Sequence, residues 1–456
     1  MSESRPIAQS PSPGGEDRRC RLAWWTLALA LIGGGILRSV WIEDMEWKKD
    51  EQWSYRMSQE VGRTRPWPWV GMPTSLGFPN PGLSAWIFVP IGRIANTPTS
   101  MTRVVVLLNM IGLIGFAGAV RAYLAPRERE PWLWGLALQA VSPYAIRLSR
   151  KIWPPSILTP LLLLLWIGHR HRRARWGAFA WGLVGALIGQ VHLSGWFVAA
   201  GLALGTVVDE CRGRLPRSRY WHFWLLGTAL GLLSALPWAR TLPRTPLALP
   251  AGTVDKIIVR HAFGYLYGVV ASSTSVLAYA ALGLGKDTPD YEISPIIDGI
   301  PTHVPDLLGL SIILVIVVRV VVRLVDAIVA PGLRWASGMI AHGVGGRRNE
   351  DASASGEPAH ADGQCASTGF YLWSTIAIPS VIFLLTTDVY FYHYFFVLCP
   401  FLFVLLAVCL LPWRRVLLGL VIAQALMSCA FLNYIHQKGG TVRGEYGLTY
   451  ARRVNR

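Results

Sequence analysis

The chain has 456 residues, of which 52% are hydrophobic and only 15% are charged, and its formal net charge is +17. With a mean hydropathy of +0.39, this composition excludes an ordinary soluble domain and is typical of a polytopic membrane protein. The positive charge does not indicate a nucleic-acid partner, because the arginines lie in short clusters between apolar segments, where they orient helices in a bilayer. We therefore expect an all-α polytopic membrane protein.

Residues 1–21 are predicted to be a disordered cytoplasmic tail, and the first apolar segment, 22–41, to be a membrane span. This segment is too long for a signal-peptide core, and no small-residue cleavage site follows it. The next loop, 42–99, contains "QWSYRMSQEVG" (52–62), which can form an amphipathic helix, and "PGLSAWIFVPIGRI" (81–94), a short apolar segment with a proline. We expect both to lie along the membrane surface rather than to cross it.

Two rules together predict the remaining layout: a span needs about 20 mainly apolar residues, and arginine clusters mark the cytoplasmic side. They give about eleven spans with the N-terminus inside. The arginine clusters assigned to the cytoplasm are Arg18-Arg19-Arg21, Arg121/Arg127/Arg129, Arg170/Arg172/Arg173/Arg175, Arg212/Arg214/Arg217/Arg219, Arg347-Arg348 and Arg414-Arg415. The predicted spans are 22–41, 100–122, 131–147, 155–168, 176–191, 194–208, 221–237, 304–326, 369–387, 394–412 and 416–433.

These spans divide the chain into a membrane module over 22–237, an outer loop over 238–303 and a second group of spans over 304–433. Within the outer loop, the apolar segment 261–285 is expected to be an interfacial or re-entrant helix, and whether it crosses the membrane stays open. Residues 331–368 are predicted to form a cytoplasmic linker, disordered over "RRNEDASASGEPAHADGQ". Residues 434–456 form an outer tail, placed where it can cap an outward-facing cavity.

The six cysteines are Cys20, Cys211, Cys365, Cys399, Cys409 and Cys429. None lies in a loop predicted to be outside and none forms a CxxC pair, so we expect neither a disulfide framework nor a thiolate metal site.

An adjacent acidic pair, Asp50 and Glu51, stands a few residues past the first span, in "EWKKDEQWSYRMSQE". Two neighbouring carboxylates repel, and proximity to the bilayer raises the pKa of at least one, so such a group can act as general base for a hydroxyl or amine. Taken alone, the pair favours the alternative of solvated loop carboxylates. Its position between the span and the amphipathic segment favours a catalytic role, with Asp50 as the base and Glu51 secondary.

A cationic turn, "RLSRKIWPP", holds Arg147, Arg150 and Lys151 on a side that is predicted to be external, where Lys and Arg are normally scarce. Arginine presents a rigid fork that fits phosphate oxygens, and lysine presents a compact point charge. We therefore predict that the cluster binds a donor phosphate. The alternative for any single residue is snorkelling of its charge to the lipid headgroups.

Two histidines, His192 in "GQVHLSGWF" and His393 in "YFYHYFF", fall in turns on the same predicted side. They can donate hydrogen bonds to a phosphate or a sugar, or bind a divalent cation beside Asp50, although no HxH or HExxH spacing supports a metal. A satisfied core histidine is the alternative for each. The aromatic residues predicted to contact the sugar or the acceptor, rather than only to anchor the chain at the bilayer interface, are Trp53, Tyr55, Trp153 and Tyr394.

The order of these elements resembles a known family. An acidic pair follows the first span; "FPNPGLSAWIFVPIGRI" then corresponds to a "PPL-x-x-W" surface helix, "TSMTRVVVLLNMIG" to an arginine-led second span, "SPYAIRLSRKIWPPSIL" to an "SP…SR" turn, and "HYFFVLCPFLFVLLA" to a late "RY…P" span. This order is similar to that of the polyprenyl-phosphate-sugar-dependent glycosyltransferases of the C superfamily, in particular the dolichyl-phosphate-mannose-protein mannosyltransferases and the lipid A aminoarabinose transferases. The resemblance covers 20–210 and, more loosely, 370–412.

The resemblance implies an enzyme that takes a sugar from a polyprenyl-phosphate donor on the non-cytoplasmic face and passes it, with inversion, to a lipid, glycan or protein acceptor. By the same resemblance, Asp50 would act as base, Arg150 and Lys151 would lie near the donor phosphate, and Arg103 matches an arginine of the family. The expected location is the bacterial cytoplasmic membrane, with the active site facing outward. Membrane lipids are then the only other expected partners.

The chain also departs from the family pattern. Several relatives have an aspartate in the turn that reads "KIWPPS" here, His192 stands where some relatives have a lysine, and His393 replaces the arginine of "RY". A metal site built from two carboxylates therefore lacks support, and a divalent cation near Asp50 stays open.

A transporter or lipid flippase is the main alternative, and a structural or assembly subunit is a third. A transporter is expected to have inverted repeats, broken helices that meet near the bilayer midplane and charges inside the membrane. Here the predicted spans are nearly free of acids, and the polar groups gather in the external turns. This distribution favours an enzyme.

Overall fold

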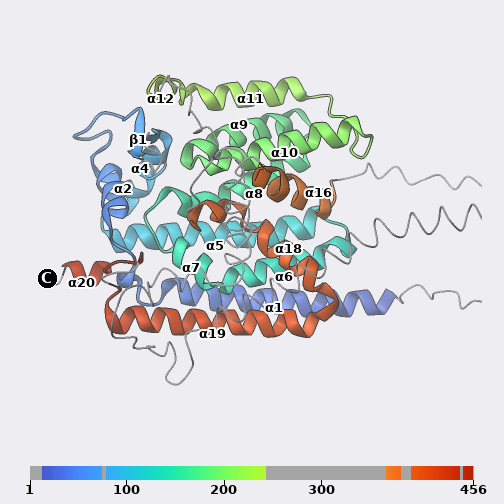
Figure 1. The fold of residues 1–456 in the computed structure, drawn as a ribbon, viewed down its shortest axis with the longest axis horizontal. Coiled ribbons are helices and arrows are strands. Elements are labelled where there is room, and N and C mark those ends of the chain that lie inside the picture. The colour runs from blue at the N-terminus through green and yellow to red at the C-terminus, as the bar shows by residue number, and fades with distance from the viewer. Residues whose placement is uncertain (1–12, 74–78, 243–365, 382–391, 442–444, 455–456) are drawn as a thin grey trace, which may run out of the picture.

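The structure is a computed structural model that describes residues 13–73, 79–242, 366–381, 392–441 and 445–454. In these ranges the chain is mostly helical, and the helices lie side by side in a bundle (Figure 1). One end of the bundle holds α2 (Lys49–Glu60) and α20 (Tyr450–Val454), and we call it the loop end. The opposite end, where α6 (Pro126–Val141) and α19 (Arg414–Lys438) begin, is called the arginine end.

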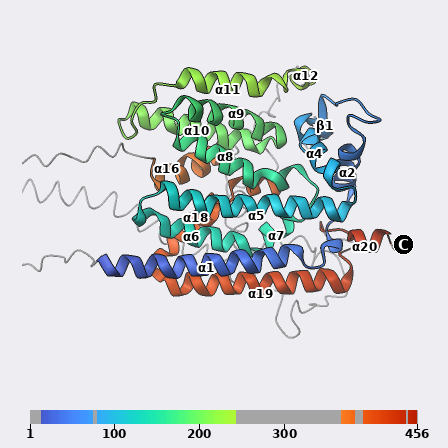
Figure 2. The same cartoon turned by 180° about the vertical axis from the view of Figure 1, so that it is seen from behind.

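Long apolar helices form the frame of the bundle. Helices α1 (Pro13–Ser39) and α19 lie together along one edge, with α5 (Pro98–Tyr123) nearby, in both views (Figures 1 and 2). Three segments are long and apolar enough to cross a membrane, namely Cys20–Ser39, Pro98–Tyr123 and Phe401–Lys438. A fourth is possible if the bent pair Pro143–Ser149 and Pro154–Arg170 counts as one span. The described residues therefore indicate an integral membrane protein with three or four candidate spans.

The predicted number of about eleven spans is not found in the described part of the chain. Most of the other predicted spans coincide with helices, but none of these helices has, when taken alone, the length and hydropathy of a full crossing. They are α6, α8 (Leu158–Arg170), α9 (Arg175–Val191), α10 (Ser194–Cys211) and α11 (Trp221–Leu233). The predicted spans 394–412 and 416–433 correspond to η4 (Tyr392–Leu398), α18 (Phe401–Leu410), η5 (Leu411–Trp413) and α19.

Prolines explain why the helices are interrupted on both sides of α7 (Pro143–Ser149). Ser142 precedes Pro143 and is extended, so α6 ends there and α7 begins in a new direction. Trp153 is likewise extended before η2 (Pro154–Ile157), which leads into α8. The axes on the two sides of this break differ by 104°. The cationic turn that the sequence singled out is located at this bend.

Glycines allow α9 and α11 to pack backbone to backbone. A Cβ atom added to Gly182 would lie 2.1 Å from the carbonyl oxygen of Trp224, and one added to Gly227 would lie 2.1 Å from that of Phe179. No larger side chain fits in either place. Small residues of this kind let membrane helices approach closely, which fits the apolar character of both helices.

At the loop end, α2 packs against α3 (Leu83–Trp86) and α4 (Val89–Ile94), with a hairpin of β1 (Val70–Pro73) and β2 (Pro79–Pro81) beside them. Met57 and Val61 of the α2 side meet Ala85 and Val89 in a small apolar core. The amphipathic helix predicted for 52–62 is thus present. The segment 81–94 is also helical, although it forms two short helices rather than one.

The arginine end brings together segments that the sequence placed on one side of the membrane. The Arg414 guanidinium donates to both oxygens of Glu130, at 2.6 and 2.9 Å. Arg170 donates to the carbonyl oxygen of Ala366 at 2.9 Å, and the Ser218 hydroxyl donates to that of Arg172 at 2.9 Å. The Ser218 contact joins the predicted arginine clusters 170–175 and 212–219, and the Arg414 contact joins a third cluster to Glu130, next to the fourth at 121–129. All of these segments lie at the arginine end.

Several predictions fall on other parts of the chain. The span 304–326, the segment 261–285 and the linker 331–368, except for its last residues, lie outside the described residues. The span 369–387 is described only to residue 381, where α16 (Thr368–Leu372) continues into a π-helical segment, η3 (Trp373–Ala377). Helix α1 begins at Pro13, so part of the tail predicted to be disordered is helical. The remaining short elements are η1 (Ile42–Asp44) and α12 (Leu236–Ala239).

Candidate functional site

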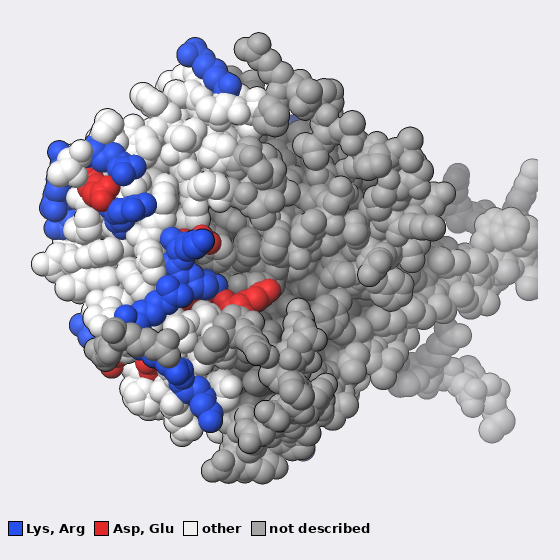
Figure 3. Space-filling view, turned by 60° about the vertical axis from the view of Figure 1, so that its left-hand side comes forward, with Lys and Arg blue, Asp and Glu red and all other residues white. Residues whose placement is uncertain are grey.

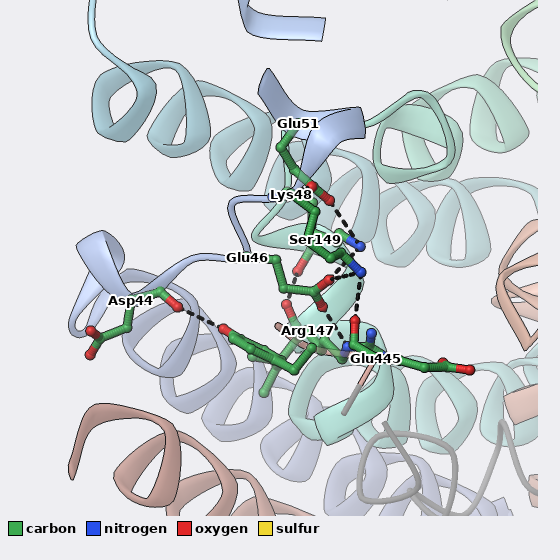
Figure 4. Close-up of polar contacts among 10 residues, drawn as sticks. Asp44, Glu46, Lys48, Glu51, Arg147, Ser149 and Glu445 are labelled. Carbon is green, nitrogen blue, oxygen red and sulfur yellow. Dashed lines mark hydrogen bonds and ion pairs between the residues drawn. The ribbon is translucent and has the colours of Figure 1, made fainter. Parts of the chain in front are cut away.

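A buried carboxylate, Glu46, lies among three cations at the loop end (Figure 4). Its Oε1 accepts a hydrogen bond from Arg147 Nε at 2.6 Å, and its Oε2 lies 2.7 Å from Lys151 Nζ and 3.0 Å from Lys48 Nζ. Burial alone would raise the pKa of Glu46, but the three cations outweigh this effect and hold its pKa well below the usual range. Glu46 is therefore ionised at neutral pH.

Glu51 is a second carboxylate of the same cluster, and it is fully buried. Its Oε1 lies 3.1 Å from Lys151 Nζ, and its Oε2 accepts a hydrogen bond from the backbone N–H of Lys48 at 2.9 Å, which caps α2. The Lys151 ammonium thus lies between two carboxylates, and it also stands 4.4 Å from the centre of the Trp153 ring. We call Glu46, Glu51, Lys48, Arg147 and Lys151 the Glu46 network.

Asp50 lies at the edge of this network, in the first turn of α2, and its side chain is exposed. Enough protein surrounds the carboxyl to remove part of its hydration, and this effect, together with the negative charge of Glu51, raises the pKa of Asp50. Lys151 and Lys48 oppose the shift without cancelling it. Figure 3, which looks toward the loop end, shows acidic side chains next to basic ones on this surface. Asp50 is therefore an accessible carboxylate whose proton affinity is increased.

Arg150 lies apart from the Glu46 network. Its guanidinium donates to the carbonyl oxygens of Leu37 at 3.5 Å and Trp41 at 2.5 Å, and its side chain is buried. The last carbonyls of a helix lack amide partners within the helix, and Arg150 supplies such partners at the end of α1. This position does not match the contact with a donor phosphate that the sequence predicted for Arg150.

His192 brings together the turns that contain Trp153 and Tyr394. Its ring centre is 6.5 Å from that of Trp153 and 5.8 Å from that of Tyr394, and its Nδ1 is 2.5 Å from the Ser194 hydroxyl. Burial lowers the pKa of His192 to about 4, so the ring is neutral at pH 7. It can share a hydrogen bond, but it is not a cation for a phosphate.

The remaining predicted residues take different positions. Tyr55 donates from its hydroxyl to the carbonyl oxygen of Asn96 at 2.7 Å, which ties α2 to the segment before α5. Trp53 is half-buried on α2 and packs against the apolar core. His393 belongs to η4, but its side chain lies outside the described part of the structure.

A segment from the far end of the sequence covers the Glu46 network. Thr449 forms an antiparallel bridge with Glu46, and Lys48 Nζ donates to the carbonyl oxygen of Glu445 at 2.6 Å. The buried Tyr446 donates from its hydroxyl to the carbonyl oxygen of Asp44 at 2.7 Å (Figure 4). The outer tail that the sequence placed near the cavity therefore packs on residues 44–48.

Beside this segment, Asp44 and His436 form a close pair. His436 Nδ1 is 2.7 Å from Asp44 Oδ2, and the imidazole stacks on Trp41 with ring centres 4.3 Å apart. Burial raises the pKa of Asp44, and His436 partly offsets the shift. The pair fastens the last turn of α19 to the segment that leads into the Glu46 network.

Sequence reasoning missed Glu46, Lys48, Tyr446 and the Asp44–His436 pair as parts of this region. The sequence did contain an indication for Glu46, because it is one of several acids that directly follow the first apolar segment, and two lysines stand close to it. The sequence contained no such indication for Tyr446 and His436, since their partners are about 400 positions away.

The donor set does not fit a divalent cation. In the described ranges, no group of three or more His, Cys, Asp or Glu side chains could hold a metal ion. The buried carboxylates next to Asp50 already face Arg147, Lys151 and Lys48, and a divalent cation would have to displace these charges.

Comparison of the chain with protein-family models, with curated proteins and with solved structures gives no match. The resemblance to the C-superfamily glycosyltransferases therefore depends on the order of the short motifs and on the chemistry of the loop end.

Proposed function

We propose that the protein is a membrane glycosyltransferase that moves a sugar from a polyprenyl-phosphate donor to a lipid, glycan or protein acceptor, with Asp50 as general base. The proposal rests on one observation: an exposed carboxylate of raised pKa borders a buried charge network at the end of an apolar bundle. Buried charges cost several kcal/mol unless they are well paired, and apolar residues would often stabilise a fold equally well. A network drawn from residues 46–51, 147–151 and 445–449 is therefore better explained by function than by stability.

The chemistry needs only one essential carboxylate. The anomeric carbon of the donor already bears a good leaving group, so the protein must hold the phosphate, exclude water and deprotonate the acceptor. The acceptor oxygen or nitrogen attacks the anomeric carbon while Asp50 takes its proton, and the phosphate leaves with the electrons of the broken C–O bond. A single displacement of this kind inverts the anomeric centre. The raised pKa of Asp50 makes it a stronger base.

Within the proposal, the cations have two tasks. Arg147 and Lys151 are buried against Glu46 and Glu51, so they hold these carboxylates in place rather than meet a ligand. The side chain of Lys48 is 32% exposed, and Lys49 is exposed next to Asp50. These two lysines are the cations that we assign to the donor phosphate, in place of Arg147, Arg150 and Lys151.

The proposed layout keeps about eleven crossings, with the N-terminus in the cytoplasm and Asp50 outside. It is supported by the separation of charges along the bundle. The arginine clusters meet at one end through Arg414, Arg170 and Ser218, whereas the Glu46 network lies at the other. Arginine-rich loops face the cytoplasm in most membrane proteins, so the loop end is assigned to the outer face.

A transporter or flippase is the second candidate, and the bend of 104° favours it. Transporters place charged groups where a spanning helix is broken, and Arg147 and Lys151 flank this break. The enzyme is preferred because these charges meet the external loop residues Glu46 and Glu51 at the end of the bundle.

The test is transfer of a labelled sugar from candidate polyprenyl-phosphate donors by purified protein, with membrane extract as the source of acceptor. Asp50→Asn should lower the transfer rate roughly 10²- to 10⁴-fold, the usual contribution of a general base. Glu43→Gln, which changes an exposed acid nearby, is the matched control and should change the rate less than about twofold, because no proton transfer is assigned to it. Full turnover by Asp50→Asn would refute its role. Movement of intact donor across vesicles without any labelled product would assign the protein to the flippases.

A further inference from the structure

A cavity lined by both charged and aromatic side chains lies at the arginine end, remote from the Glu46 network. It has a volume of about 690 Å³ and is bounded by the end of α10, the loop after it and the start of α16. Asp209, Arg212 and Arg214 line one side of it, and Ser367, Phe370 and Trp373 line the other. The proposed glycosyl transfer uses none of these residues.

The loop that bears the two arginines is held firmly. Both carboxylate oxygens of Glu210 accept hydrogen bonds at 3.0 Å, one from the backbone N–H of Ser218 and one from the indole N–H of Trp221. The backbone N–H groups of Arg214 and Leu215 both donate to the carbonyl oxygen of Asp209, at 2.8 and 3.1 Å. The backbone of the loop is thus fixed before any ligand arrives, so binding has to order only the arginine side chains.

The lining combines positive charge with an aromatic surface. Arg212 is exposed, and the Arg214 side chain is 68% exposed. The Asp209 carboxylate is 3.9 Å from the Arg214 guanidinium, too far for a hydrogen bond, so it neutralises the cavity only in part. Trp373 is 48% exposed across from the arginines. Tryptophan next to arginine at the ends of apolar helices is typical of the zone where lipid headgroups meet the hydrocarbon.

We propose that this cavity binds the headgroup phosphate of an anionic phospholipid. The guanidinium groups of Arg212 and Arg214 provide paired N–H donors for phosphate oxygens, and the Ser367 hydroxyl adds a donor on the opposite side. Trp373 packs against the apolar part of the lipid. Basic pockets between membrane helices recognise lipid headgroups in this way. The proposal does not depend on the glycosyltransferase activity.

The experiment measures lipid binding to the purified full-length chain in detergent by native mass spectrometry, with phosphatidylglycerol as the anionic probe and phosphatidylcholine as the reference. Arg212→Gln with Arg214→Gln should weaken phosphatidylglycerol binding about 25-fold, since each arginine contributes roughly a fivefold preference for anionic lipid. Phosphatidylcholine binding should stay unchanged.

Arg217→Gln with Arg219→Gln is the matched control, because it removes the same charge from the same loop at positions that do not line the cavity. It should change phosphatidylglycerol binding less than twofold. Asp209→Asn removes the opposing carboxylate and should tighten binding severalfold, a gain that a folding defect cannot produce. Equal losses in the two double variants would overturn the proposal in favour of diffuse charge attraction. Displacement of the lipid by millimolar inorganic phosphate would overturn it in favour of a free-phosphate site.

Discussion

Replacing Glu46 by Gln should destabilise the protein far more than any exposed acid-to-amide change. The substitution keeps the shape of the side chain and removes its charge, so Arg147 and Lys151 lose the carboxylate between them. The Arg147 side chain is 0% exposed and cannot turn to water for hydration. The loss of stability therefore reports the cost of leaving a buried cation without a neutralising carboxylate.

The magnitude follows from the geometry of the network. Breaking a buried ion pair by removing one partner costs about 3–5 kcal/mol. Lys151 retains Glu51 at 3.1 Å, which limits the loss on its side. We therefore expect the lower part of this range, about 3 kcal/mol, for Glu46→Gln.

The assay is SDS titration of the purified protein, followed by tryptophan fluorescence, and it yields the change in free energy of unfolding. Glu60→Gln is the matched control, because Glu60 also pairs with an arginine, Arg65 at 3.1 Å, but both side chains are about a third or more exposed. An exposed pair contributes less than about 1 kcal/mol. Similar losses for Glu46→Gln and Glu60→Gln would refute the claim that burial of the Glu46 network controls its energetics.

The pH dependence gives a second check on the same substitution. The folded-state pKa of Glu46 lies below its ordinary value of 4.5, so its stabilising contribution is complete above that value and is lost as the pH falls below it. The stability difference between wild type and Glu46→Gln should therefore be constant from pH 7 to about pH 5 and shrink in more acidic buffer. A difference that disappears already between pH 7 and pH 6 would contradict the assignment.

Three further predictions concern other parts of the molecule. The rate of sugar transfer should rise with pH along a limb whose midpoint lies above the ordinary aspartate pKa of 3.8, because the pKa of Asp50 is raised and only the ionised form accepts a proton; a midpoint at or below 3.8 in a pH–rate profile would contradict this. Tyr446→Phe removes the 2.7 Å hydrogen bond to the Asp44 carbonyl and should cost about 1–3 kcal/mol of unfolding free energy by SDS titration; no change would mean that the contact is dispensable. Gly227→Val should separate α11 from α9 and cost more than about 2 kcal/mol, whereas Gly118→Val, where an added Cβ meets nothing within 4 Å, should cost less than about 1 kcal/mol; equal costs would show that close helix packing is unimportant.

Local patterns predicted the helices well. Apolar length located α1 and α5, although α1 begins at Pro13 rather than at residue 22, and amphipathic periodicity located α2. The charge bias predicted that Arg170, Arg172 and Arg414 belong to one end of the bundle. These features depend only on the residues of one segment and on the solvent around it, so they can be predicted without knowledge of the fold.

Partners distant in the sequence could not be predicted. The cationic turn suggested phosphate binding because Lys and Arg are scarce in external turns, yet Glu46 and Glu51 pair with Lys151 from at least 100 positions earlier in the sequence. The predicted span 131–147 also missed the break at Pro143, where α6 ends and α7 begins, because hydropathy does not register the break that a proline imposes. Which charges are buried, and against what, depends on packing that only the structure reveals.

The contact between Tyr446 and Asp44 joins positions 402 residues apart, and this separation has a consequence for biogenesis. A ribosome that adds about 5–20 residues per second needs roughly 20 to 80 s to cover that distance. Throughout this interval the first hydrophobic helices can already be inserted, while Glu46 and Lys48 are not yet covered by the segment 445–449. A messenger interrupted shortly before the codon for Glu445 would therefore yield a product that enters the bilayer but whose Glu46 network lacks the segment 445–449 that covers it.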